Sequence, residues 1–154
     1  MNTKATPAKS STVSLLEQCF QAIAAEADTI RALMPKVESE DATFKSDLTL
    51  WLGDTTALAA RVGALMSEVG EAPLESGLMS RMTAKVATSM NTLMDSSVSH
   101  IAELLLQHAT ATMTDAIRAL REFENSTASE AALALARDLI KHEETHAERM
   151  KRYL

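Results

Sequence analysis

The sequence predicts an all-α protein built as a four-helix bundle, and three observations support this fold class. The chain has 154 residues, which suits one domain, and only four Gly and three Pro residues interrupt it. Hydrophobic residues make up 46% of the sequence and are mostly the helix formers Ala, Leu and Met. Apolar residues also recur at helical spacing in four segments of roughly 20 to 30 residues, which bury their apolar faces best against one another.

The first helix is expected over residues 14–34, after a flexible polar tail at residues 1–12. Ser14 and Glu17 form a capping-box pattern, and a proline follows residue 34. The acidic residue Glu26 lies at the edge of the apolar stripe. That stripe consists of Leu16, Cys19, Phe20, Ile23, Ala27, Ile30 and Met34.

The second helix is expected over residues 41–69, with Gly70 as its C-terminal cap. Asp47 and Asp54 flank its apolar stripe. Gly53 lies in the middle of this segment and costs about 1 kcal/mol relative to Ala, without breaking the pattern. The first two helices are joined by a short charged turn, so they are predicted to form an antiparallel hairpin.

A long connection follows, and it is expected to contain a short fifth helix over residues 78–94 before the third main helix at 97–123. The inward positions at the centre of that third helix are predicted to be Leu106, Ala109 and Met113. The last helix is expected over residues 128–153, opened by a second capping box at 127–130. A connection as long as the one between the second and third helices can cross the whole bundle.

Two helical hairpins joined by a long crossover, with Glu143 and His146 in a Glu-x-x-His pattern, resemble the ferritin-like superfamily. The stretches "GEAPLESG" and "HIAELLLQHATATMTDAIRAL" resemble small bacterial ferritin-like proteins in particular. This resemblance implies inward Glu residues on two helices and Glu-x-x-His on the other two, which together hold two metal ions. The second helix has no His, and the third has no inward carboxylate. The resemblance therefore implies the fold with an incomplete di-iron ligand set.

The segment His142-Glu143-Glu144-Thr145-His146 allows three interpretations. As HExxH it matches a zinc protease motif, but no His follows it to supply a third ligand. As a metal site, His142, Glu143 and His146 would bind iron, zinc or another divalent transition metal, with Asp47 and Glu26 leaning toward them. As a structural pair, the two histidines would hydrogen-bond to Asp47, Glu26 or Tyr153 in the core.

Helical phase places His142 and His146 closer to the bundle interior than Glu143. On the third helix, His100 and His108 project away from the apolar stripe, so both are expected at the surface. The single cysteine, Cys19, is expected to be a small buried side chain.

Charge and composition limit the function classes. A formal net charge of −6 without a basic cluster argues against a nucleic-acid partner. No apolar run reaches the ~20 residues of a membrane span, and the N-terminal segment lacks the pattern of a signal peptide. With one cysteine and no disulfide framework, the expected location is the cytoplasm.

Three functions remain open at this point. The leading expectation is a non-enzymatic protein that self-associates as a dimer or larger homo-oligomer, or binds a protein partner, in a stress response. The second is a metal-binding or storage protein that uses His142, Glu143 and His146. The third is an amphipathic coat protein for a granule or lipid surface.

Overall fold

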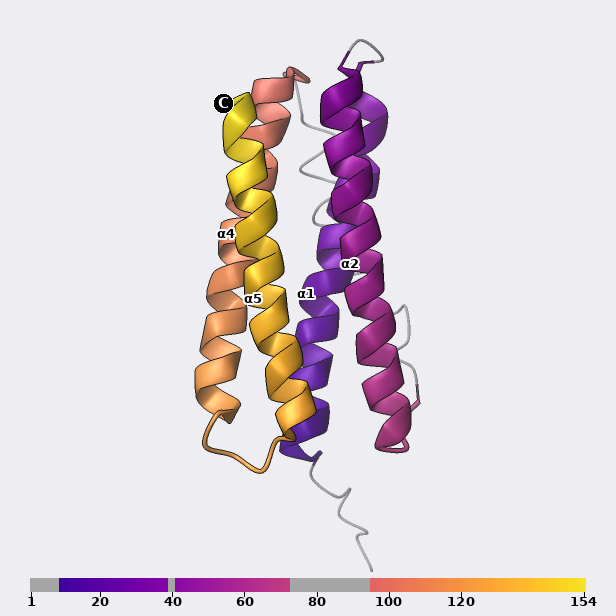
Figure 1. Cartoon of the computed structure of the whole chain (residues 1–154), viewed down its shortest axis with the longest axis vertical. Helices are drawn as coiled ribbons and strands as arrows, with labels where there is room; N and C mark the ends of the chain where they lie inside the picture. Colours follow the sequence, from indigo (N-terminus) through magenta and orange to yellow (C-terminus); the bar gives the residue numbers. More distant parts are fainter. Residues whose placement is uncertain (1–8, 39–40, 73–94) are drawn as a thin grey trace, which may run out of the picture.

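The computed structural model describes residues 9–38, 41–72 and 95–154, and these residues are helical except at turns and helix ends. Four long helices lie side by side with nearly aligned axes, and we call this arrangement the bundle (Figure 1). They are α1 (Ser11–Leu33), α2 (Ala42–Glu68), α4 (Val98–Phe123) and α5 (Glu130–Met150). Short 3-10 turns follow α1 at Met34–Lys36 and α5 at Lys151–Tyr153. The all-α prediction is confirmed.

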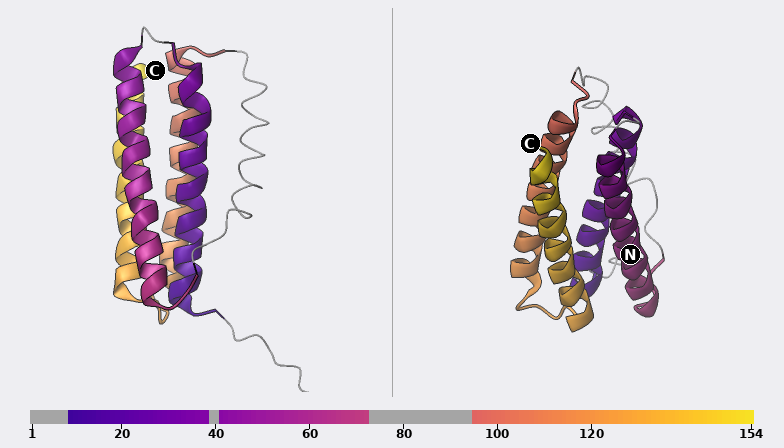
Figure 2. Two further views of the ribbon diagram at one scale, coloured as in Figure 1. Left: turned by 90° about the vertical axis from the view of Figure 1, so that its right-hand side faces the viewer. Right: turned by 45° about the horizontal axis from the view of Figure 1, so that its top comes forward.

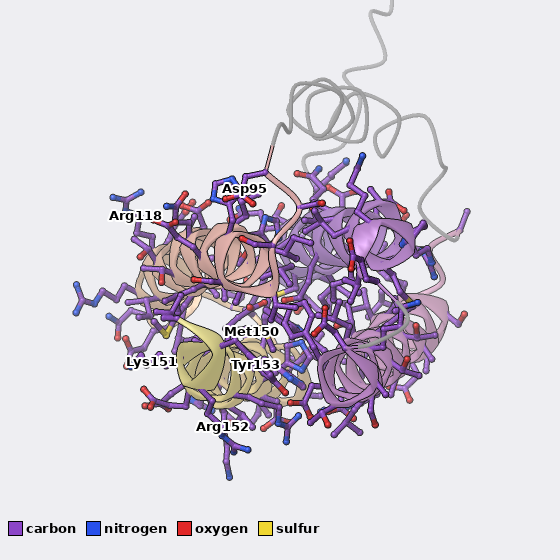
Figure 3. All side chains as sticks on the ribbon, turned by 90° about the horizontal axis from the view of Figure 1, so that it is seen from above. Asp95, Arg118, Met150, Lys151, Arg152 and Tyr153 are labelled. Carbon is purple, nitrogen blue, oxygen red and sulfur yellow. The ribbon has the colours of Figure 1, made fainter. Side chains whose placement is uncertain are left out.

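The helices form two antiparallel hairpins, α1 with α2 and α4 with α5 (Figure 2). Viewed along the bundle, α1 and α5 lie diagonally opposite each other, and side chains fill the space between the four helices (Figure 3). The end of α2 and the beginning of α4 lie at opposite ends of the bundle, as the predicted crossover requires. The helix expected over 78–94 lies outside the described residues.

Two helices begin at residues other than those predicted. In α1 the N-cap is Ser10, whose hydroxyl accepts a hydrogen bond from the Val13 N–H at 3.2 Å. In α5 it is Ser129, which accepts from the Ala132 N–H at 3.2 Å. The capping boxes expected at 14–17 and 127–130 are therefore wrong. Extending α1 toward its N-terminus buries Val13, and burial of an apolar side chain outweighs a local capping signal.

The predicted end of α2 is confirmed. Gly70 has φ of +76°, and the Glu71 N–H donates to the Met66 carbonyl at 3.0 Å, which closes the last turn. The helix is continuous through Gly53, where a Cβ atom would meet nothing within 4 Å.

Alanine substitutions at these two glycines are expected to change the stability of the protein in opposite directions. Gly53→Ala is expected to raise the free energy of unfolding by about 1 kcal/mol, because it restricts the unfolded chain and fits an open helical site. Gly70→Ala is expected to lower it by about 1 kcal/mol, because an L-residue is strained at this φ. Urea unfolding followed by circular dichroism measures both changes. A destabilising Gly53→Ala variant would contradict a continuous α2.

Buried apolar side chains form two clusters, one toward each end of the bundle. The cluster at the α4–α5 loop end contains Leu16, Ile23, Val62, Leu135 and Leu139, among others. The cluster at the C-terminal end contains Ile30, Phe44, Trp51, Leu105 and Met150, among others. Cys19 is buried as predicted, and burial raises the pKa of its thiol to about 11.

The phase of α4 differs from the prediction at two of three positions. Ala109 is buried as expected, but Leu105 and Thr112 are buried where Leu106 and Met113 were predicted, and those two are only partly buried. The difference arises because α4 packs against both α1 and α5, so the buried face is centred between these two helices.

The chain end is held against α2. The Tyr153 hydroxyl donates to Asp47, and its ring packs edge-on against Phe44 with centroids 4.7 Å apart. Arg149 lies 4.0 Å from the same carboxylate. Lys151 and Arg152 point away from the bundle, whereas Tyr153 points toward α2 (Figure 3). None of the described helices has the length and apolar character needed to cross a membrane.

Candidate metal centre

A layer of buried polar side chains lies between the two apolar clusters. Its most buried members are Glu26, Thr55 and Glu143, each 0% exposed, and His146, 1% exposed. They come from α1, α2 and α5, the three helices whose faces meet here. Because burying ionisable groups is costly, a group of them in one layer requires partners.

The prediction that the two histidines face the interior more than Glu143 does is wrong, because Glu143 is completely buried. On α5 the buried stripe runs through Leu139, Glu143, His146 and Met150, a spacing of four, three and four residues. His142 lies beside this stripe, and its side chain is 7% exposed. The Glu-x-x-His pair is therefore the inward pair of the segment.

Glu26 connects α1 to both other helices. Its Oε2 atom lies 2.8 Å from Nε2 of His142 and accepts a hydrogen bond from the Thr55 hydroxyl at 2.8 Å. The Thr55 oxygen also lies 3.2 Å from Nε2 of His142, so the three groups form a closed triangle. Burial alone would raise the pKa of Glu26, but hydrogen bonds from His142, Glu143 and Thr55 together with the charge of His142 lower it.

Glu143 faces Glu26 without a cationic partner of its own. Both of its carboxylate oxygens, and Oε1 of Glu26, are buried without a hydrogen-bond partner among the described residues when both groups are ionised. Burial, the charge of Glu26 and a hydrogen bond to Glu26 raise the pKa of Glu143 to about 11. Without metal, Glu143 therefore keeps a proton and donates it to Glu26.

His146 is fixed from three sides. Its ring stacks on Trp51 with centroids 4.9 Å apart, and Nε2 lies 3.1 Å from Oδ2 of Asp54. Arg149 approaches Nδ1 at 3.4 Å. Burial and the charges of His142 and Arg149 lower the pKa of His146 to about 4 against the attraction of Asp54 and Glu26, so the ring is neutral near pH 7. A neutral imidazole is the form that binds metals.

Two groups of donor atoms result, and His142 belongs to both. We call Glu26, His142 and Glu143 the inner group, and Asp54, His142 and His146 the outer group. Within each group the ligand atoms lie within 4.8 Å of one another. Four of the five residues that the sequence suggested as metal ligands belong to these two groups. The fifth, Asp47, belongs to neither group. It accepts a hydrogen bond from Tyr153 and lies 4.0 Å from Arg149.

The register of α2 against α5 explains why Asp54 and Thr55 were missed. The sequence-based interpretation had Asp47 leaning toward the two histidines. In the structure Tyr153 lies beside Asp47, so the chain end falls more than one helical turn short of the beginning of α2. The sequence showed that Asp54 lies at the edge of the apolar stripe of α2. It did not show that Asp54 lies at the same depth in the bundle as the histidines.

His108 was also misjudged. It is partly buried on α4, 3.5 Å from the Thr112 hydroxyl, and burial lowers its pKa against the attraction of Glu26. His100 lies 3.7 Å from Glu103 at the edge of the helix, as the sequence indicated. Neither residue belongs to the two donor groups.

These donor groups fit a bound metal ion better than they fit a zinc protease or a complete di-iron centre. Two carboxylates and an imidazole, with three carboxylate oxygens lacking partners, match the ligands of iron, zinc and similar ions. Asp54 is a third donor beside His142 and His146. However, the Glu of an HExxH zinc protease acts as general base, whereas Glu143 is fully buried and faces Glu26. Both donor groups draw on α1, α2 and α5 alone, so within the described residues α4 contributes no ligand.

Comparisons with known proteins returned no matching family model, curated protein or solved structure. The ferritin-like assignment therefore stays a prediction.

Proposed function

We propose that this protein binds a divalent transition-metal ion at the centre of the bundle, in the inner group of Glu26, His142 and Glu143. The observation that carries this proposal is the set of three buried carboxylate oxygens without partners, all in a layer where an imidazole is also present. A cation would supply the missing partner and offset the cost of burying two carboxyl groups side by side. An imidazole among the ligands favours zinc, iron or cobalt over calcium and magnesium.

The metal-free state is also accounted for. With the proton on Glu143 and a hydrogen bond from His142 to Glu26, the layer holds together without an ion. Metal binding would replace the Glu143 proton, because a carboxylate ligand must be ionised. Uptake of one ion is therefore coupled to release of a proton.

Metal titration tests the proposal. Protein without a histidine tag is freed of metal with a chelator and titrated with Co²⁺ or Zn²⁺ by calorimetry. We expect binding with proton release. Glu143→Gln, which keeps the shape but cannot ionise, is expected to weaken it by at least about tenfold, a loss of about 1.4 kcal/mol.

His100→Ala is the matched control, since it removes an imidazole near a carboxylate on α4, outside both donor groups. Its affinity should equal that of the wild type. Equal metal content in the wild type and in a His142→Ala/His146→Ala double variant would refute the proposal.

Self-association, partner binding in a stress response, and the coating of a granule or lipid surface remain separate proposals. Each is compatible with a metal in the bundle. Light scattering over a range of protein concentrations tests self-association, and flotation with lipid vesicles tests the coat.

A further inference from the structure

The two donor groups differ in depth through one exposed ligand, Asp54. The side chain of Asp54 is 51% exposed, whereas those of His142 and His146 are 7% and 1% exposed. Glu26 and Glu143, which complete the inner group, are 0% exposed. From solvent to core, the ligands thus follow the order Asp54, the two histidines, and the two glutamates.

A surface pocket of about 330 Å³ opens over the outer group, between α2 and α5. Asp54, His142 and His146 all line it. The remaining lining residues are Ala57, Leu58, Arg61, Asp138, Lys141 and Thr145. Arg61 pairs with Asp138 at 2.8 Å, so these two charges largely compensate each other. The exposed carboxylate of Asp54 is then the acidic group next to the histidines.

A route to the inner group along the bundle axis is unfavourable. Along the bundle axis the layer is flanked by the two apolar clusters, and moving a charged ion through either one is costly. On the pocket side, the ion meets a carboxylate and two imidazoles in succession. These donors can replace its hydration shell in steps.

We propose that Asp54, His142 and His146 form an entry site that captures a divalent transition-metal ion from solvent and passes it to the inner group through their shared ligand, His142. This inference rests on the proposed function. It assigns Asp54 to capture and Glu26 and Glu143 to retention. The two imidazoles favour ions such as Zn²⁺, Fe²⁺ and Co²⁺ over Mg²⁺.

Binding kinetics separate capture from retention. Co²⁺ uptake and release are followed by stopped-flow absorption in the wild type, Asp54→Asn and Glu143→Gln. Asn keeps the size of Asp and an oxygen that can accept from His146, so the fold is preserved. We expect Asp54→Asn to slow uptake and release by about fivefold or more with little change in equilibrium affinity. Glu143→Gln is expected to weaken the affinity itself.

A second variant tests the route. Ala57 is exposed and lines the pocket, so Ala57→Phe is expected to narrow it and to slow uptake and release to a similar degree. Ala111→Phe is the matched control, because Ala111 is also exposed but lies on α4 beside a different pocket. It should bind Co²⁺ at the wild-type rate.

The outcomes distinguish the two proposals. Wild-type kinetics in both Asp54→Asn and Ala57→Phe would overturn the entry site and leave the inner site intact. So would an Asp54→Asn variant whose equilibrium affinity falls as far as that of Glu143→Gln, since Asp54 would then be a permanent ligand. A wild-type protein that takes up no Co²⁺ would refute the proposed function and the entry site with it.

Discussion

Replacing Glu143 by leucine is expected to stabilise the metal-free protein by about 1 to 3 kcal/mol and to abolish metal binding. Glu143 is completely buried, and neither of its oxygens has a cationic or hydrogen-bond-donating partner. Leucine has a similar volume and would join the buried stripe between Leu139 and Met150. A stabilising Glu143→Leu variant would show that Glu143 does not serve the metal-free fold, as expected for a ligand of the proposed metal site.

Glu26→Leu provides the contrast. Glu26 is equally buried, but its Oε2 accepts hydrogen bonds from Thr55 and His142 at 2.8 Å each. Thr55 keeps its hydrogen bond to the Trp51 carbonyl at 2.8 Å, but His142 loses its carboxylate partner and the proton of Glu143 loses its acceptor. We therefore expect the metal-free protein to lose about 2 to 4 kcal/mol. Both variants are expected to lose the proposed metal binding, but their stabilities should change in opposite directions.

Urea unfolding with a chelator present measures these changes, and Co²⁺ titration measures the loss of binding. If Glu143→Leu destabilises the protein as much as Glu26→Leu does, the hydrogen bond that Glu143 donates to Glu26 outweighs the cost of burying its carboxyl group. Glu143 would then serve the metal-free fold, and the argument from its two oxygens that accept no hydrogen bond would fail.

Elements governed by local chemistry were predictable from the sequence. Gly70 ends α2 because its backbone needs a positive φ. The sequence predicted the start of α4 to within one residue, and in the structure Ser97 is the N-cap that accepts from the His100 N–H. The starts of α1 and α5 were misplaced because several serines and threonines compete there. Which of them caps a helix depends on contacts between distant segments, such as the Ser129 N–H with the Thr12 hydroxyl at 2.9 Å.

The sequence could predict which side chains of one helix face the site, but not which side chains of different helices meet there. The spacing from Leu139 to Glu143, His146 and Met150 is present in the sequence, so the inward Glu-x-x-His pair could have been found from the apolar residues on either side. Choosing Asp54 over Asp47 required the register of α2 against α5. That register depends on how side chains such as Tyr153 and Phe44 pack, and no single helix encodes it.

Stability of the metal-free wild type is expected to fall by about 1 to 2 kcal/mol between about pH 7 and pH 8.5, because of Glu143. In the unfolded chain this carboxyl has an ordinary pKa of 4.5 and is ionised throughout this interval, whereas in the folded protein its pKa is about 11. The folded state thus binds one more proton, and the free energy of unfolding decreases as pH rises. Cys19, with an ordinary pKa of 9.0, adds its own loss only at higher pH.

Glu143→Gln isolates this effect, because glutamine cannot ionise and its stability should stay level over the same interval. Below about pH 6.5 the stability of the Glu143→Gln variant is expected to depend on pH through His146. The pKa of His146 is lowered from 6.5 to about 4, so its contribution is complete above pH 6.5 and is lost as pH falls toward 4. In the wild type the Glu143 contribution grows over that range and offsets the loss, whereas the variant shows the loss alone. Parallel pH profiles for the two proteins would show that Glu143 is ionised in the folded state.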